Sequence, residues 1–231
     1  MSRGWPSPII AACLLARIDR GAHSRISPAQ RRAALIVLAA GAYGSPAILL
    51  RSGIGPGLAH ALPVGEGLSD HVGAGIGWAA TEALQRETDD FAAGAPAFMG
   101  QVTVRSRTRD CPEGISDLLL FPALDPGWEI SAAAFVMKPR PRGRVTLLSD
   151  DSAAPLSIEH GFLSDEQDAL ALEEGIERLR ELAASEPLTR YAANEVRPGS
   201  AVDAATHARE SARGFFHPTG TCAIGNVVDR D

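Results

Sequence analysis

The chain has 231 residues, enough for one large domain or two small ones. With 45% hydrophobic and 22% charged residues, its composition is that of a soluble globular protein, which excludes a disordered one. The formal net charge of −6 excludes a protein that holds nucleic acid on a basic surface. Glycine (23) and proline (16) are abundant, which favours a loop-rich α/β or α+β fold.

The three cysteines, Cys13, Cys111 and Cys222, are too few and too scattered for a disulfide framework, and no CxxC pair indicates a metal site. No apolar run reaches the roughly 18 residues of a membrane span. The apolar stretch Ile9–Ala16 resembles a signal peptide, but it is short and no small-residue cleavage site follows it. We therefore expect a cytoplasmic protein without metal, membrane or nucleic-acid partners.

The first clear element is a strand over Leu35–Ala40, because a continuous apolar run is typical of a strand buried on both faces of a parallel sheet. Glycines interrupt the run after Ala40. Ser45 and Pro46 then predict a helix, with Ser45 as its N-cap and the proline in its first position. The helix is expected to end at Ser52-Gly53.

The segment between residues 57 and 76 is rich in glycine, and we expect it to be irregular. Thr81–Ala95 is polar and predicts a loop or a short helix. Beyond it, short apolar segments separated by turn residues predict strands of a mixed or antiparallel sheet. These strands are expected at Gln101–Arg105, Asp117–Phe121, Ile130–Met137 and Arg144–Leu148.

One amphipathic helix is predicted downstream, where Ser164 and Gln167 have the spacing of a capping box. Apolar residues then recur at steps of three and four and form a single stripe that would pack on a sheet. The stripe consists of Ala169, Leu172, Ile176, Leu179 and Ala183, and Pro187 marks its end.

The run LAAGAYGSPAILLRSGIGP, which ends at Pro56, resembles almost position for position the second signature of the glucose-methanol-choline (GMC) oxidoreductase family. A strand that ends in small residues lets a nucleotide approach its backbone closely. The resemblance implies that Ala40, Gly41, Ala42 and Ser45 lie near an FAD cofactor.

Two later segments extend this resemblance. LPVGEGLSDH, which ends at His71, is similar to the family's LP-VG-x-x-L-x-DH element, and RPRGRVTLLSDD resembles the start of its C-terminal region. The segment HPTGTC, from His217 to Cys222, resembles the family's HPxGTC segment, whose histidine lies at the flavin. Alcohol oxidation releases a hydroxyl proton that a neutral imidazole can accept near neutral pH. His217 is therefore the expected catalytic base, whereas His71 and Cys222 are interpreted as structural.

Members of this family begin with a GxGxxG turn that binds the FAD pyrophosphate, and no such pattern occurs in the sequence. The resemblance covers roughly residues 20–231, so we expect a chain truncated at both ends. We also expect it to bind FAD weakly or not at all unless a complementing polypeptide supplies the GxGxxG segment.

The predicted fold is α/β with mixed α+β character: a remnant of an FAD-binding Rossmann-like domain and a substrate domain with a mixed or antiparallel sheet flanked by helices. Expected boundaries are 1–75 for the partial FAD-binding domain, 76–205 for the substrate-binding domain, and 206–231 for a return to the FAD-binding domain. The predicted function is FAD-dependent oxidation of a small-molecule alcohol. The alternative is a non-catalytic substrate-domain or assembly module, whereas a hydrolase is disfavoured because no GxSxG elbow occurs.

Overall fold

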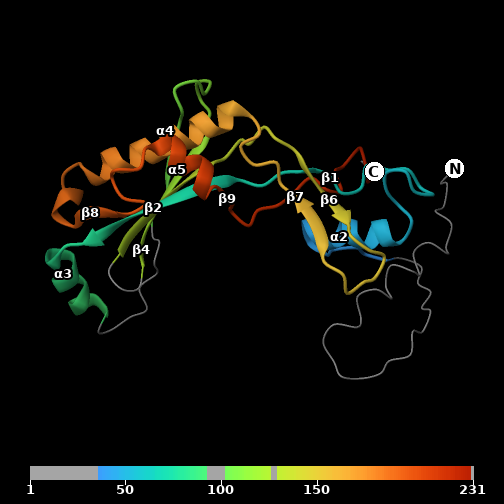
Figure 1. Ribbon diagram of the computed structural model, residues 1–231, viewed down its shortest axis with the longest axis horizontal. Helices are drawn as coiled ribbons and strands as arrows, with labels where there is room; N and C mark the ends of the chain where they lie inside the picture. The colour runs from blue at the N-terminus through green and yellow to red at the C-terminus, as the bar shows by residue number, and fades with distance from the viewer. Residues whose placement is uncertain (1–35, 93–101, 126–128, 230–231) are drawn as a thin grey trace. The chain divides into compact units, whose positions relative to one another are not determined.

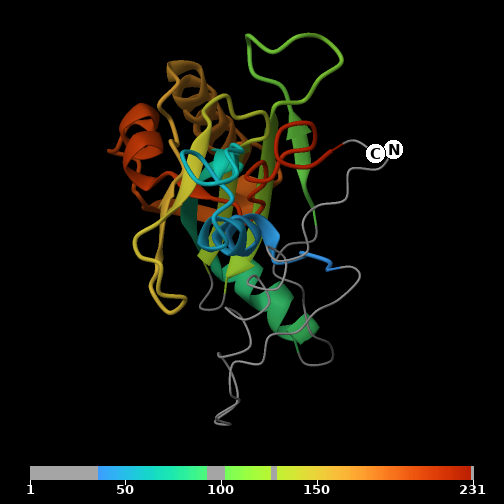
Figure 2. The ribbon, with the colours of Figure 1, turned by 90° about the vertical axis from the view of Figure 1, so that its right-hand side faces the viewer.

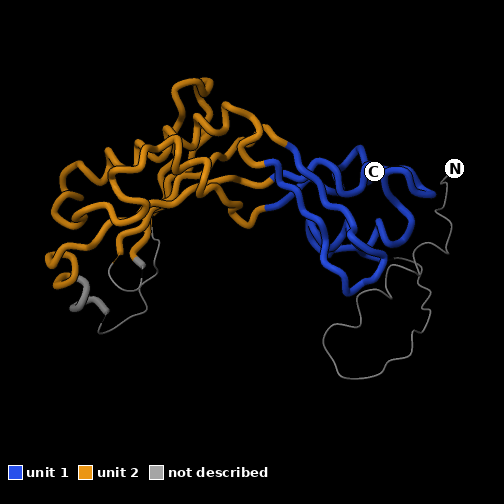
Figure 3. Tube along the Cα trace, in the orientation of Figure 1, with its two compact units in different colours: residues 1–69, 142–161, 218–231 blue, residues 70–141, 162–217 orange. Residues whose placement is uncertain are grey.

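The computed structural model describes residues 36–92, 102–125 and 129–229 (Figure 1). Leu35, Gln101, Cys13 and the Ile9–Ala16 stretch lie outside the described residues. No helix in the described ranges is both long and apolar enough to cross a membrane. The described residues divide into two units, coloured separately in Figure 3. Unit 1 takes the residues up to 69, 142–161 and those from 218, and unit 2 takes 70–141 and 162–217.

Unit 1 combines one helix with a small antiparallel sheet. The helix is α2 (Gly41–Arg51), and the three strands follow the order β1-β6-β7. Helix α2 lies against β6, as both Figure 1 and Figure 2 show. The strands are β1 (Glu66–Leu68), β6 (Gly143–Leu147) and β7 (Leu156–Glu159), and one cluster of buried core residues consists of Ile54, Val64 and Val227.

The strand predicted over Leu35–Ala40 is wrong for residues 36–40, which are irregular. Val37 is 76% exposed, the opposite of a residue in a doubly covered strand. Among the described residues no strand pairs with this segment. A β-strand needs a neighbour to bond its N–H and C=O groups, so an apolar run alone does not make one.

Helix α2 begins at Gly41, earlier than predicted, and Ser45 is not its N-cap. Instead the Ser45 hydroxyl accepts a hydrogen bond from the Ala40 amide at 3.0 Å. Pro46 lies inside the helix and has no N–H to give to the Ala42 carbonyl four residues earlier. The Thr221 hydroxyl donates to that carbonyl at 2.7 Å, which compensates for the missing helical bond. The predicted end is confirmed, because Ser52 is the C-cap.

Unit 2 is built on a six-stranded antiparallel sheet in the order β3-β4-β5-β2-β8, with β9 also paired to β2. This confirms the predicted α/β class and its antiparallel sheet. The strands are β2 (Val72–Ala80), β3 (Val104–Ser106), β4 (Leu118–Asp125), β5 (Glu129–Val136), β8 (Ala192–Arg197) and β9 (Arg213–Gly214). The helical elements are α3 (Glu82–Ala92), α4 (Glu166–Ala183), the 3₁₀ turn η1 (Leu188–Arg190) and α5 (Ala204–Ser211).

The expectation that residues 57–76 are irregular is confirmed for 57–65 but wrong for 66–68 and 72–76, which form β1 and the start of β2, a strand that lies between β5 and β8. Every second residue of β2 points into one core, where Val72, Ile76 and Trp78 are buried. Glycines occupy the alternate positions. Helices α4 and α5 cover the core face, as Figure 1 shows.

Helix α4 forms as predicted, with its cap displaced by one residue. Asp165, not Ser164, is the N-cap, and its carboxylate accepts a hydrogen bond from the Gln167 amide. The predicted stripe is confirmed as core, with Leu172 and Ile176 completely inaccessible and Ala183 half-buried at its end. Asp168 is buried as well, where it accepts hydrogen bonds from the Arg140 backbone amide at 3.0 Å and guanidinium at 3.2 Å.

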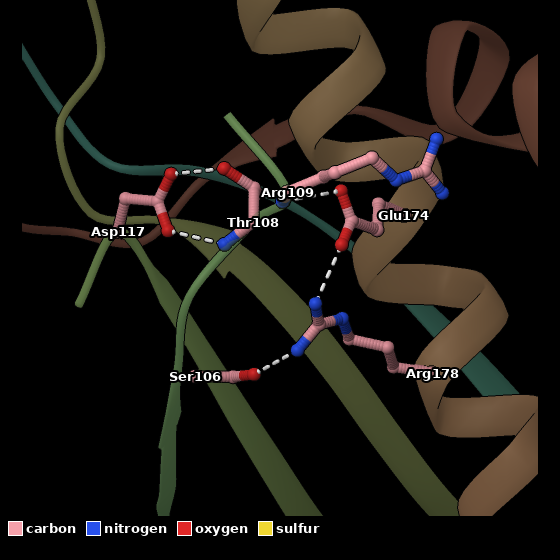
Figure 4. A network of polar contacts seen from close by, with 6 residues as sticks. All are labelled: Ser106, Thr108, Arg109, Asp117, Glu174 and Arg178. Atoms are coloured by element: carbon pink, nitrogen blue, oxygen red, sulfur yellow. Dashed lines mark hydrogen bonds and ion pairs between the residues drawn. The ribbon is translucent and has the colours of Figure 1, made fainter. Parts of the chain in front are cut away.

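A polar network fixes the loop between β3 and β4 to α4 (Figure 4). The amide and hydroxyl of Thr108 donate to the Asp117 carboxylate at 2.8 and 2.5 Å. Glu174 on α4 accepts from the Arg109 amide at 3.1 Å and pairs with Arg178. Burial raises the pKa of Asp117, but the two bonds from Thr108 and one from the Cys111 thiol outweigh it and lower this pKa below its ordinary value of 3.8.

We expect Asp117→Asn to lower the free energy of unfolding by about 1–2 kcal/mol at pH 7, because an amide replaces a charged acceptor. A carboxyl with a lowered folded-state pKa stabilises the fold above its unfolded value, and this contribution disappears as the pH falls through the folded value. The gap between wild type and variant should therefore close below about pH 4 in urea titrations. A gap that is constant from pH 7 to pH 2 would contradict this assignment.

Candidate active site

The pairing of β2 with β9 brings two distant sequence motifs together. Val72 lies opposite Gly214, and Gly73 lies opposite Arg213. Because the two strands are antiparallel, the residues just before β2 lie beside those just after β9. The Phe215 amide accordingly donates to the His71 carbonyl at 2.9 Å. The DH element and the HPTGTC segment, 146 positions apart in their histidines, thus meet at one end of the sheet.

His217 is exposed, and its surroundings fix both its backbone and its ring. Its amide donates to the buried Asp70 carboxylate at 2.9 Å. Its imidazole meets the His71 ring edge-to-face, with centroids 5.5 Å apart and an interplanar angle of 89°. The Phe215 ring lies 4.6 Å away at 63°. The predicted catalytic base therefore lies beside His71, which was interpreted as structural.

The Phe215 ring packs on Phe135 of β5. Their rings stack with centroids 3.8 Å apart and an interplanar angle of 23°. Gly73 lies directly across from Phe135 on the same face of the sheet. A Cβ at Gly73 would come within 2.1 Å of Phe135 Cδ1 and 2.6 Å of the Ala134 carbonyl oxygen, so only glycine leaves room for this stack.

We expect Gly73→Ala to lower the free energy of unfolding by about 1–3 kcal/mol, because the new methyl group must displace the Phe135 ring and adjoining backbone. The matched control is Gly75→Ala on the same strand, where a Cβ meets only the Ala132 carbonyl oxygen at 3.6 Å. That change should be neutral or slightly stabilising, since alanine restricts the unfolded chain. Urea titrations of both variants measure the difference, and equal midpoints would contradict the packing described.

His71 and His217 differ in their electrostatic environment. Burial, followed by the proximity of His217, lowers the pKa of His71, and Lys138 acts in the same direction. Asp70 and a backbone hydrogen bond with Val136 raise the pKa of His71, but they do not reverse the shift. His71 Nδ1 is buried and has no hydrogen-bond partner within the described part of the chain. His71 is therefore neutral at pH 7, whereas the ring of His217 lies at an exposed position.

The residues expected at the cofactor lie in unit 1, at the start of α2. Gly41 is exposed and adopts φ +76°, and no heavy atom lies within 4 Å of where its Cβ would be. The N-cap residue Ala40 makes no side-chain cap bond, and the positive end of the helix dipole lies at this turn. Ala40 and Ala42 add only methyl groups. This small-residue turn fits a group that must approach the backbone closely, while Ser45 holds the turn through the Ala40 amide.

Sequence reasoning missed His71 and Phe215 as neighbours of His217. The signal that places them is the β2–β9 register, and β9 has only two residues. Cys222 packs against the core of unit 1, and burial raises the pKa of its thiol. It is therefore protonated at pH 7, which agrees with a packing role. Among the described residues no cluster of histidine, cysteine, aspartate or glutamate could hold a metal ion.

Comparison with known proteins gives consistent matches along the chain. Residues 15–73 match the N-terminal model, and residues 139–231 the C-terminal model, of a family described as GMC oxidoreductase. The 5-(hydroxymethyl)furfural oxidase of Methylovorus sp. is 30% identical over 87% of this chain and 42% of the relative. The oxygen-dependent choline dehydrogenase of Ectopseudomonas mendocina is 29% identical over 84% and 42%. The chain thus spans less than half the length of these relatives.

Solved structures share the same architecture. The pyridoxine 4-oxidase of Mesorbium loti superposes with a TM-score of 0.67 at 25% identity, over 82% of this chain and 42% of that one. A formate oxidase of Aspergillus oryzae RIB40, in which FAD modification has been studied, gives a TM-score of 0.66 at 18% identity, over 79% and 43%. The latter likeness concerns the fold alone.

Proposed function

Because the chain belongs to the GMC oxidoreductase family, we propose that it serves FAD-dependent oxidation of a CH–OH donor, with His217 as the catalytic base. The observation that carries this proposal is the environment of His217. An exposed imidazole, anchored through its amide on a buried carboxylate and flanked by two rings, is fixed in place and open to a substrate. Relatives named for hydroxymethylfurfural and choline support a small-molecule alcohol as the substrate.

In the proposed reaction the alcohol loses a hydride and a proton, and each goes to a different acceptor. FAD, when bound, supplies the acceptor for the hydride that leaves the carbinol carbon with its two electrons. The hydroxyl proton goes to the neutral imidazole of His217, and the carbon–oxygen bond becomes a carbonyl. Asp70 holds the His217 backbone during this transfer. His71, which is neutral, adds no positive charge that would oppose protonation of its neighbour.

For the cofactor we propose Ala40, Gly41, Ala42 and Ser45 as contacts. The open space at Gly41 and the uncapped start of α2 support close approach of an anionic group to the backbone. We further propose residues 1–75 and 206–231 as FAD-binding parts and 76–205 as the substrate-binding part. A complementing polypeptide with a strand, a GxGxxG turn and a helix would supply the pyrophosphate site.

The compartment that we propose is the cytoplasm. The thiols of Cys111 and Cys222 are free, as is usual for proteins of a reducing compartment.

The test is FAD binding followed by anaerobic reduction. The 231-residue chain is titrated with FAD alone, and again after co-expression with a polypeptide carrying the strand–GxGxxG–helix segment. After unbound FAD is removed by gel filtration, we expect weak or undetectable flavin absorbance in the chain alone and stable flavin absorbance in the pair. Choline, hydroxymethylfurfural and pyridoxine are then added without oxygen, and bleaching of the flavin identifies a substrate class.

Two outcomes would reject this function. A folded pair that stays colourless with excess FAD favours the alternative, a non-catalytic module. That alternative has one structural observation in its support, since unit 2 has a hydrophobic core of its own. A flavin-loaded pair that no alcohol bleaches, although dithionite does, would retain the cofactor assignment and reject alcohol oxidation.

A further inference from the structure

We propose that His71 is a positioning residue for His217: its ring, fixed just before the start of β2, restricts rotation of the His217 imidazole. The inference rests on the proposed function, because it assigns His71 a task in the same site. It concerns contacts within unit 2 and can be tested without a cofactor.

The geometry supports a role in orientation. An imidazole on an exposed loop rotates freely about its χ2 bond unless neighbours limit it. His217 has ring neighbours at two different angles, 89° for His71 and 63° for Phe215. Phe215 is in turn stacked on Phe135, which belongs to the sheet. Both neighbours of the His217 ring are thus fixed to the sheet, one through β2 and the other through the stack on β5.

The charges around the pair keep the His71 ring neutral. Four groups act on the pKa of His71: His217 and Lys138 lower it, whereas Asp70 and the Val136 carbonyl raise it. Burial also lowers the pKa of His71 and is the largest influence. Two imidazoles whose ring centroids lie 5.5 Å apart do not readily hold two protons, so the two rings act on each other electrostatically.

The side chain of His71 is not what connects β2 to the 213–217 segment. That connection is made by the His71 carbonyl, which accepts from the Phe215 amide, and this bond does not depend on the side chain. The ring Nδ1 makes no hydrogen bond in the described part of the chain. Apart from a hydrogen bond with the Val136 backbone, what the ring contributes is its contact with His217.

The experiment is NMR of the full chain labelled with ¹³Cε1-histidine, titrated from pH 4 to pH 9. His217→Asn identifies the His217 signal and should raise the pKa of His71 by about half a unit to one unit, because a positive neighbour is removed. His71→Ala should move the His217 ring-proton shifts by removing a ring current, whereas His71→Phe should restore most of that shift. His60→Asn in unit 1 is the control, since the bonds of His60 to Gly53 and Gly55 are backbone bonds.

Two results would overturn the proposal. One is a His71 titration that is the same in wild type and His217→Asn, which would show that the rings do not interact electrostatically. The other is a His217 spectrum that is unchanged in His71→Ala, which would show that they do not touch in solution. If His71→Ala fails to fold by circular dichroism, His217→Asn decides alone. An unbleached flavin combined with intact His71–His217 coupling would reject the proposed function and leave the coupling in place.

Discussion

His217→Asn is expected to slow alcohol-dependent flavin reduction by about 10²–10⁴-fold, the range typical of removing a general base. Asparagine keeps a polar side chain of similar reach, but its amide cannot accept a proton near neutral pH. The fold should be unaffected, because the Asp70 carboxylate is bonded to the His217 amide and not to its ring. The loss should therefore appear in the rate of reduction and not in the melting curve.

The measurement is anaerobic stopped-flow reduction of the flavin-loaded protein by an alcohol. His60→Asn is the matched control and should retain the wild-type rate. A His217→Asn variant that keeps the wild-type rate would remove His217 from the mechanism.

The contrast between α4 and residues 36–40 shows what the sequence can predict. Helix α4 was predictable because all its information is local: a cap, a stripe of apolar residues at helical spacing, and a charged opposite face. The strand over Leu35–Ala40 was inferred from apolarity alone. Whether an apolar run becomes a strand depends on a partner elsewhere in the fold, and none of the described residues provides one.

The glycines of β2 led to the opposite error, in which a strand was predicted as irregular. Glycine is rare in strand interiors because it adds no packing surface and is flexible, so residues 57–76 were interpreted as irregular. The alternation of Val72, Ala74 and Ile76 with glycines was nevertheless visible in the sequence. The reason for glycine at position 73 is the Phe135 ring across the sheet, a contact that no local pattern contains.

The sequence predicted the chemistry of the candidate site but not which residues lie beside His217. His217 followed from the resemblance of HPTGTC to a known segment, and its assignment as base stays a prediction. Its contacts with His71 and Phe215 depend on a two-residue strand, which is too short to carry any periodicity. Which residues lie side by side at such a short strand depends on the strand register, and the register is a property of the folded sheet.

Leu172→Ala is expected to have the largest effect on stability, lowering the free energy of unfolding by about 2–5 kcal/mol. Leu172 is completely buried at the centre of the face that α4 turns to the sheet. Truncation removes Cγ and both Cδ methyl groups from the core. The cavity that remains cannot be filled by a collapse of β2 and β5, because their backbones are held by ladders on both sides.

The matched control is Leu170→Ala on the same helix. Leu170 is 44% exposed, so the same chemical change should cost less than about 1 kcal/mol. Both changes alter helix propensity equally, and the difference between them therefore isolates burial. Trp78, buried in the same core, is a suitable fluorescence probe once Trp5 and Trp128 are replaced by phenylalanine. If the two variants unfold at the same urea concentration, α4 does not pack on the sheet through the Leu172 face, and the predicted stripe has no structural meaning.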